Sequence, residues 1–129
     1  MALGEEPTRV ATLSIPGAAL DVRGFEIHEA LNRPFAVAAT ALSPDPDLDL
    51  DGPIGEAAAL LVRHPSGDRR YAGVVRRIVQ VDVEPSGLST YLVEIVPKLW
   101  ALKHTKRYRV FQGASEVEVA RKVLGGFGI

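Results

Sequence analysis

The chain has 129 residues, 47% of them apolar, and it contains no cysteine. This length allows one domain with a buried core and is too short for two ordinary domains. The formal net charge of −1 excludes a globally basic nucleic-acid binder, and the lack of cysteine excludes a disulfide framework and any Cys-ligated metal or iron–sulfur site. An apolar content this high with so little net charge argues against disorder.

The near-neutral sum conceals an asymmetry between the two halves of the chain. Residues 1–64 hold four Lys or Arg residues against ten Asp or Glu residues, a net charge of −6, whereas residues 65–129 hold eleven against six, a net charge of +5. This division predicts charge-complementary contacts between subunits or with a partner, which would set register more than affinity.

The first residues carry no targeting pattern. The start of the chain is acidic where a signal peptide would be basic, and no apolar run approaches the ~18 residues of a membrane span. We therefore expect a product made in the cytoplasm, without a signal peptide and without membrane binding by this segment.

Prolines and glycines divide the chain into short segments, most of which have the two-residue period of β-strands. The predicted strands cover residues 10–15, 20–31, 35–42, 56–64, 69–84, 89–96 and 106–112. The strand over 69–84 exceeds ordinary strand length, so we expect a β-bulge or bend near Arg76 and Arg77. Consecutive strands joined by turns predict an all-β fold, a small antiparallel β-barrel, because closure removes exposed edges.

Two segments between these strands are distinctive. Asn32, Arg33 and Pro34 break the chain before residues 35–42, which are apolar on both faces. That strand is either buried on two sides or part of a subunit contact, so Phe35 and Val37 are candidate interface residues with core packing as the alternative. Residues 43–53 form a loop without regular period.

One helix is predicted, at the C-terminal end of the chain. Ser115 as N-cap and Glu118 three residues later form a capping box, and Gly125 and Gly126 end the helix. The expected division is a disordered or extended N-terminus over residues 1–8, a β-barrel domain over 9–113, and a C-terminal helix with the start of a continuation over 114–129.

The acidic part of the loop resembles half of a calcium site. Residues 47–52 place carboxylates and a glycine as in the first half of an EF-hand loop, but position twelve is Ala58 and no helix flanks the loop. A solvated acidic loop is the better interpretation. His28, His64 and His104 each lack a second ligand at metal spacing.

No catalytic constellation is visible. The chain has neither the Gly-x-Ser-x-Gly turn of serine hydrolases nor a phosphate-binding glycine loop, and the glycines at 125–128 follow a helix instead of opening one. We therefore predict no catalytic residue, metal site or cofactor, and no enzyme activity.

A basic segment over residues 98–109 carries Trp100 and Tyr108, which could stack on single-stranded nucleic acid. The alternative is that Leu99, Trp100 and Leu102 pack into the barrel as an anchor, with the cationic residues on a solvated face or a partner surface. Charge balance disfavours nucleic acid. As a partner surface, the segment offers Lys103, Lys106 and Arg107.

The same region carries a family resemblance. A strand ends in Pro97-x-Leu99-Trp100-x-Leu102, and Arg109-Val110-Phe111-Gln112 and then the helix and its glycine follow. This order resembles the amino-terminal hub region of the VgrG spike proteins of type VI secretion systems and related hubs of contractile phage tails and extracellular injection systems, with Val110 replacing the family's Ile. Upstream, residues 71–75 are similar to the family's aromatic-x-Gly-Ile-Val, which places Gly73 in the motif, and the order agrees over about residues 9–128.

The resemblance implies a structural hub module that forms the trimeric base of a spike and seats on an Hcp-like tail-tube ring. Family members continue into a second hub barrel, an oligonucleotide-fold domain and a β-helical needle, and they are delivered with the injection apparatus or secreted by it. The motif residues it implies as structural are Gly73, Pro97, Leu99, Trp100, Leu102, Arg109, Phe111 and Gln112. A small β-barrel module that binds single-stranded nucleic acid is the alternative function.

Overall fold

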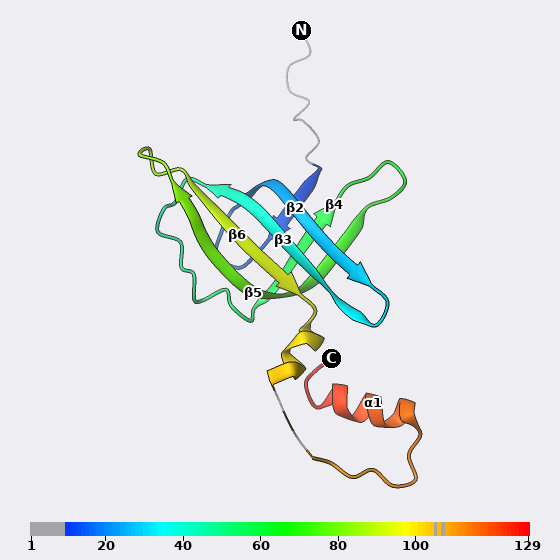
Figure 1. The fold of residues 1–129 in the computed structure, drawn as a ribbon. Helices are drawn as coiled ribbons and strands as arrows, with labels where there is room; N and C mark the ends of the chain where they lie inside the picture. Colours follow the sequence, from blue (N-terminus) through cyan, green and yellow to red (C-terminus); the bar gives the residue numbers. More distant parts are fainter. Residues whose placement is uncertain (1–9, 105, 107) are drawn as a thin grey trace.

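The computed structural model describes residues 10–104, 106 and 108–129 (Figure 1). Its elements are β1 (Ala11–Ser14), β2 (Asp21–Ala30), β3 (Arg33–Ser43), β4 (Ala57–Val62), β5 (Arg69–Val83), β6 (Ser89–Val96), the 3₁₀ segment η1 (Lys98–His104) and α1 (Glu116–Gly125). The prediction of an antiparallel all-β fold with one short C-terminal helix is confirmed. Among the described residues no helix is long and apolar enough to cross a membrane.

The six strands form one antiparallel sheet in the order β1-β4-β5-β6-β3-β2. The sheet curls into a half-barrel, so that its edge strands β1 and β2 contact each other without pairing (Figure 1). Glu29 of β2 and Arg69 of β5 form a two-pronged ion pair, with N–O distances of 3.0 and 3.2 Å. These strands are not neighbours in the sheet, so the pair shows how far the sheet has curled.

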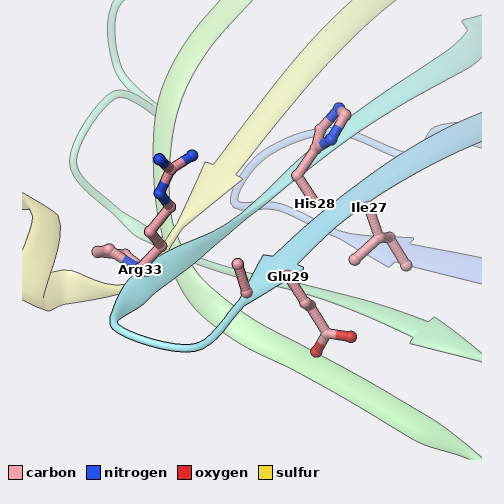
Figure 2. A pocket seen from close by; sticks show the side chains of 6 residues that line it. Ile27, His28, Glu29 and Arg33 are labelled. Carbon is pink, nitrogen blue, oxygen red and sulfur yellow. The ribbon is translucent and has the colours of Figure 1, made fainter.

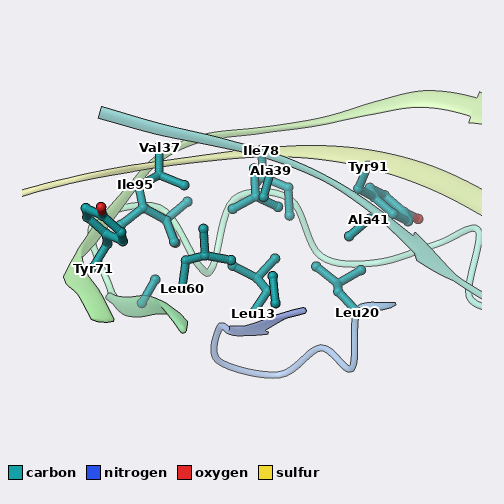
Figure 3. Packing of buried hydrophobic residues seen from close by; sticks show 14 residues of the cluster. Leu13, Leu20, Val37, Ala39, Ala41, Leu60, Tyr71, Ile78, Tyr91 and Ile95 are labelled. Atoms are coloured by element: carbon teal, nitrogen blue, oxygen red, sulfur yellow. The ribbon is translucent and has the colours of Figure 1, made fainter. Parts of the chain in front are cut away.

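The core fills the concave side of the half-barrel. Alternate residues of β3 and β6 point inward and meet Leu13 of β1 and Leu60 of β4 (Figure 3). Inward residues of β3 and β6 are almost fully buried: Val37, Ala39, Ala41, Tyr91, Val93 and Ile95. The period-two pattern of the sequence is therefore the pattern of a sheet with one buried face.

The loop between β3 and β4 closes one side of this core. Its leucines, Leu48 and Leu50, pack against the core, whereas the aspartates that alternate with them, Asp47, Asp49 and Asp51, are exposed. Tyr91 Oη donates a hydrogen bond to the Asp45 carbonyl oxygen at 2.7 Å, and Gln80 Nε2 donates to the Pro46 carbonyl oxygen at 2.7 Å. Side chains of the sheet, one buried and one half-buried, thus hold the loop in place.

The expected bulge in the longest strand is confirmed. The pairing of β5 with β6 shifts register between Val75 and Arg77, and it shifts again between Gln80 and Asp82. Each shift bends a strand that would otherwise be too long for a small curled sheet.

Two strand predictions are corrected. The break at residues 32–34 is wrong in part, because Arg33 and Pro34 belong to β3 and the turn is at Leu31 and Asn32, where Asn32 has a φ of +61°. Pro34 is tolerated because β6 pairs with β3 only from Val37 onward, so no partner on that side needs its missing N–H.

The strand predicted over residues 106–112 is also wrong. Of these residues, 106 and 108–112 are described, and they form no strand. A strand needs a neighbour for its backbone groups, and the sheet ends at β1 and β2 without pairing to this segment. Tyr108 and Val110 are accordingly almost fully exposed.

The helix and its cap form as predicted. Ser115 Oγ accepts a hydrogen bond from the Glu118 N–H, and Glu118 Oε2 accepts one from the Ser115 N–H, both at 3.2 Å. No residue of α1 is buried. The helix lies beyond the end of the half-barrel at which β6 stops (Figure 1).

Candidate functional site at the exit of the half-barrel

Of the predicted family motif, Gly73, Pro97, Leu99, Trp100 and Leu102 lie where the chain leaves the half-barrel after β6. Gly73 of β5 faces the end of β6, and a Cβ atom built on it would lie 2.1 Å from the Val96 carbonyl oxygen and 3.2 Å from Pro97 Cα. These neighbours are backbone atoms that cannot move aside cheaply. Only glycine permits this approach of the two strands.

The β-bulge brings two arginines to one carboxylate beside this crossing. Arg76 Nε donates to Glu94 Oε2 at 3.0 Å, and Arg77 Nη1 lies 3.8 Å from Glu94 Oε1. The Arg76 guanidinium also lies over the Trp100 ring, 5.5 Å from its centroid, which is within the range of a cation–π contact. Trp100 is half-buried, and its ring meets His104 edge-on at 4.7 Å.

Sequence reasoning did not identify Arg76 and Glu94 as site residues. The signal available was a glutamate at an outward position of the apolar strand β6 and an arginine pair inside β5. Pairing them requires the register of the two strands, which the sequence pattern alone does not provide.

The anchor interpretation of the Leu-Trp segment is wrong. No residue of η1 is buried, and Leu99 is 42% exposed. Leu102 is half-buried, and neither leucine nor Trp100 belongs to the core cluster. The segment therefore packs at the end of the half-barrel instead of inside it.

Beyond η1 the motif residues are mostly exposed. The Arg109 guanidinium lies 5.0 Å from the centroid of the half-buried Phe111 ring, and Gln112 is exposed. Lys98 Nζ donates to the Gly128 carbonyl oxygen at 3.2 Å, which ties the end of the chain to η1. Of the predicted cationic interface residues, Lys103 and Lys106 are exposed, and Arg107 lies outside the described residues.

The two predicted interface residues of β3 have different environments. Val37 is 1% exposed and sits in the core, so its prediction as a contact residue is wrong and the core-packing alternative holds. Phe35 is half-buried and meets the Tyr71 ring edge-on at 5.6 Å. Its ring thus covers the end of the core near the β2–β3 hairpin.

A shallow cavity of about 310 Å³ lies at that hairpin and is lined by Ile27, His28, Glu29, Ala30, Arg33 and Pro34. His28 and Arg33 point to one side of the hairpin and Glu29 to the other, where it pairs with Arg69 (Figure 2). These titratable groups do not converge on a common point. Within the described ranges, no three His, Cys, Asp or Glu residues are placed to hold a metal ion.

At the exit, Arg76, Glu94, Trp100 and His104 are held in ion-pair and ring contacts, whereas Lys103 is exposed. The fold is that of a β-structured module, a half-barrel whose edge strands do not pair. Residues 28–129 match the phage tail baseplate hub (GPD) family, which is most of the chain. The chain belongs to this family, whose role is that of a structural hub.

Relatives from Pseudomonas aeruginosa support this assignment. The type VI secretion system spike protein VgrG1b is 33% identical over 133 aligned positions, which cover 99% of this chain and 17% of that protein. VgrG1c is 31% identical over 84% of this chain and 15% of its own length. The chain therefore spans about a sixth of the length of these relatives.

A solved structure shares the fold. The E. coli c3393 protein, described as a type VI secretion component with structural similarity to the T4 bacteriophage tail proteins gp27 and gp5, superposes with a TM-score of 0.76. The match is 20% identical in sequence and covers 88% of this chain and 31% of that one.

Proposed function

We propose that this chain is the structural hub module of a spike in a contractile injection machine of the type VI secretion kind, and that it helps to form a trimeric base that joins the spike to the tail tube. The observation that carries the proposal is the hub-family match over residues 28–129. The half-barrel, with edge strands that do not pair, supports it, because unpaired strand edges present backbone groups that a neighbouring chain can pair with.

The proposed partners are further copies of the chain, an Hcp-like tube ring, and the remaining hub, oligonucleotide-fold and needle domains that the resemblance implies. Two exposed surfaces of opposite charge support such contacts: the aspartates of the β3–β4 loop and the cationic residues after β6. In this proposal Phe35, Lys103, Lys106 and Arg107 remain the candidate contact residues, and the boundaries at residues 8 and 113 remain predictions.

The proposed role is mechanical and not enzymatic, and it has the module delivered with the injection apparatus. Nucleic-acid binding lacks support, because Trp100 is engaged by Arg76 and His104 and is not free to form a stacking platform with the fully exposed Tyr108.

A chimera tests the proposal. Residues 1–129 would replace the matching segment of VgrG1b, and its binding to purified tube rings would be measured by co-sedimentation. We expect the chimera and VgrG1b, measured in parallel, to bind the rings equally. Loss of ring binding by a folded chimera would contradict the proposal.

A further inference from the structure

We propose that Arg76, Glu94 and Trp100 form a clamp, called here the exit clamp, that fixes the direction in which the chain leaves the half-barrel. The clamp is an inference about positioning within this chain. Its consequence for assembly rests on the proposed function, but its existence does not.

The first step is the β-bulge. In a regular strand Arg76 and Arg77 would point to opposite faces of the sheet. The register shift between Val75 and Arg77 lets both side chains reach Glu94. Arg76 makes the closer contact, and with side chains 31% and 18% exposed, Arg76 and Glu94 form a partly sheltered charge-assisted hydrogen bond.

The second step is the contact with Trp100. Because Glu94 holds the Arg76 guanidinium, that group is already oriented when the Trp100 ring lies against it at 5.5 Å. A fixed cation over an aromatic face keeps its attraction without the entropy cost of ordering a free arginine. The ion pair and the ring contact therefore reinforce each other.

The third step is the backbone at the exit. Val96, like Glu94, is on the outward face of β6, and it lies outside the core cluster. It is nevertheless only 1% exposed, so the chain that follows β6 covers the outward face of the sheet at this point. Gly73 permits the approach, and the Trp100 N–H donates to the Pro97 carbonyl oxygen at 2.9 Å. One tight turn thus carries the ring from the end of β6 to Arg76.

The exit clamp constrains the position of the residues that follow Trp100. Lys103 lies in η1, and Lys98 binds Gly128 at the far end of the α1 segment. If Trp100 is held, the direction of η1 is set relative to the half-barrel, and with it the position of the exposed cationic residues. Under the proposed function, this sets the register of the contacts that those residues make.

Tryptophan fluorescence tests the clamp directly, because Trp100 is the one tryptophan in the sequence. We expect Arg76→Gln to raise the acrylamide quenching constant of Trp100 about twofold, since the covering guanidinium is lost. Arg77→Gln is the matched control: it removes the same charge from the same bulge and the same carboxylate but has no ring contact, and it should leave quenching unchanged. Arg76→Lys should fall between, because it keeps the charge without the planar group.

Distance measurements between two spin labels test the consequence, and the cysteine-free chain allows clean labelling. With labels at Leu31→Cys on the β2–β3 hairpin tip and Lys103→Cys in η1, we expect one narrow distance distribution in the parent and in Arg77→Gln. Arg76→Gln and Glu94→Gln should broaden it. Melting curves of each variant would separate a released arm from an unfolded chain.

Equal quenching constants and equal distance distributions for Arg76→Gln and Arg77→Gln would overturn the exit clamp. Neither measurement involves a partner, so this result would leave the hub proposal standing. Loss of ring binding by a chimera whose exit clamp is intact would contradict the hub proposal and leave the exit clamp standing.

Discussion

At the scale of single residues, Gly73 shows how one missing side chain determines local geometry. Its φ is not in the left-handed region, so backbone freedom is not the reason for a glycine here. The reason is space, because the Val96 carbonyl oxygen occupies the place of a Cβ atom. Any larger residue must push β6 and Pro97 away from β5, at the point where the chain turns toward η1.

We therefore predict that Gly73→Ala lowers the free energy of unfolding by about 2 kcal/mol, measured by denaturant titration. The matched control is Gly24→Ala in β2, where nothing lies within 4 Å of the added Cβ atom. That variant should stay within about 0.5 kcal/mol of the parent. Equal decreases in the free energy of unfolding of the two variants would show that the close contact of Gly73 with Val96 does not determine stability.

At the scale of elements, the loop between β3 and β4 has no helix or strand of its own and depends on the sheet. Tyr91 is 1% exposed, and its hydroxyl donates a hydrogen bond to the Asp45 carbonyl oxygen. Gln80 Nε2 lies 3.3 Å from the same hydroxyl, so the two tethers are linked. Losing one partner leaves a sheltered carbonyl group without its donor.

Tyr91→Phe should lower the free energy of unfolding by about 1–2 kcal/mol and speed amide exchange in the loop. Tyr71→Phe is the control, because Tyr71 is also buried and its hydroxyl has no hydrogen-bond partner among the described residues. It should change neither quantity. Unchanged loop exchange in Tyr91→Phe would mean that the Tyr91 hydroxyl does not hold the loop.

Features that depend on the local sequence could be predicted, whereas features that depend on the pairing of strands could not. The capping box at Ser115 was predictable because it depends on residues close in the chain, and the bulge at Arg76 was predictable because the segment exceeds ordinary strand length. The strand predicted over residues 106–112 failed because alternation reports propensity and not the presence of a neighbouring strand. The contact of Arg76 with Trp100 depends on strand register and on the turn at Pro97, so no local pattern predicts it.

At the scale of the whole molecule, the charge division of the sequence becomes two exposed surfaces. The exposed aspartates Asp45, Asp47, Asp49 and Asp51 lie on the β3–β4 loop, while Lys103 and Lys106 lie beyond β6. None of these side chains has an ion-pair partner within the described residues. Unpaired charges of opposite sign on one module can steer and register contacts with its neighbours.

In the VgrG1b chimera, the double variant Lys103→Glu and Lys106→Glu should weaken assembly and reduce its dependence on salt. Arg63→Glu with Arg70→Glu makes the same change in charge on exposed residues near the β4–β5 turn, and it should have little effect. The measurement is the concentration for half-assembly at low and high ionic strength. Equal responses of the two double variants would reject the cationic residues after β6 as contact residues.

The central claim is that this half-barrel works as one part of a multi-copy hub. The most direct test is the mass in solution, by light scattering after size-exclusion chromatography, of the folded VgrG1b chimera that carries residues 1–129. The hub account predicts a mass of three chains. A strictly monomeric chimera, under conditions in which VgrG1b itself assembles, would contradict it.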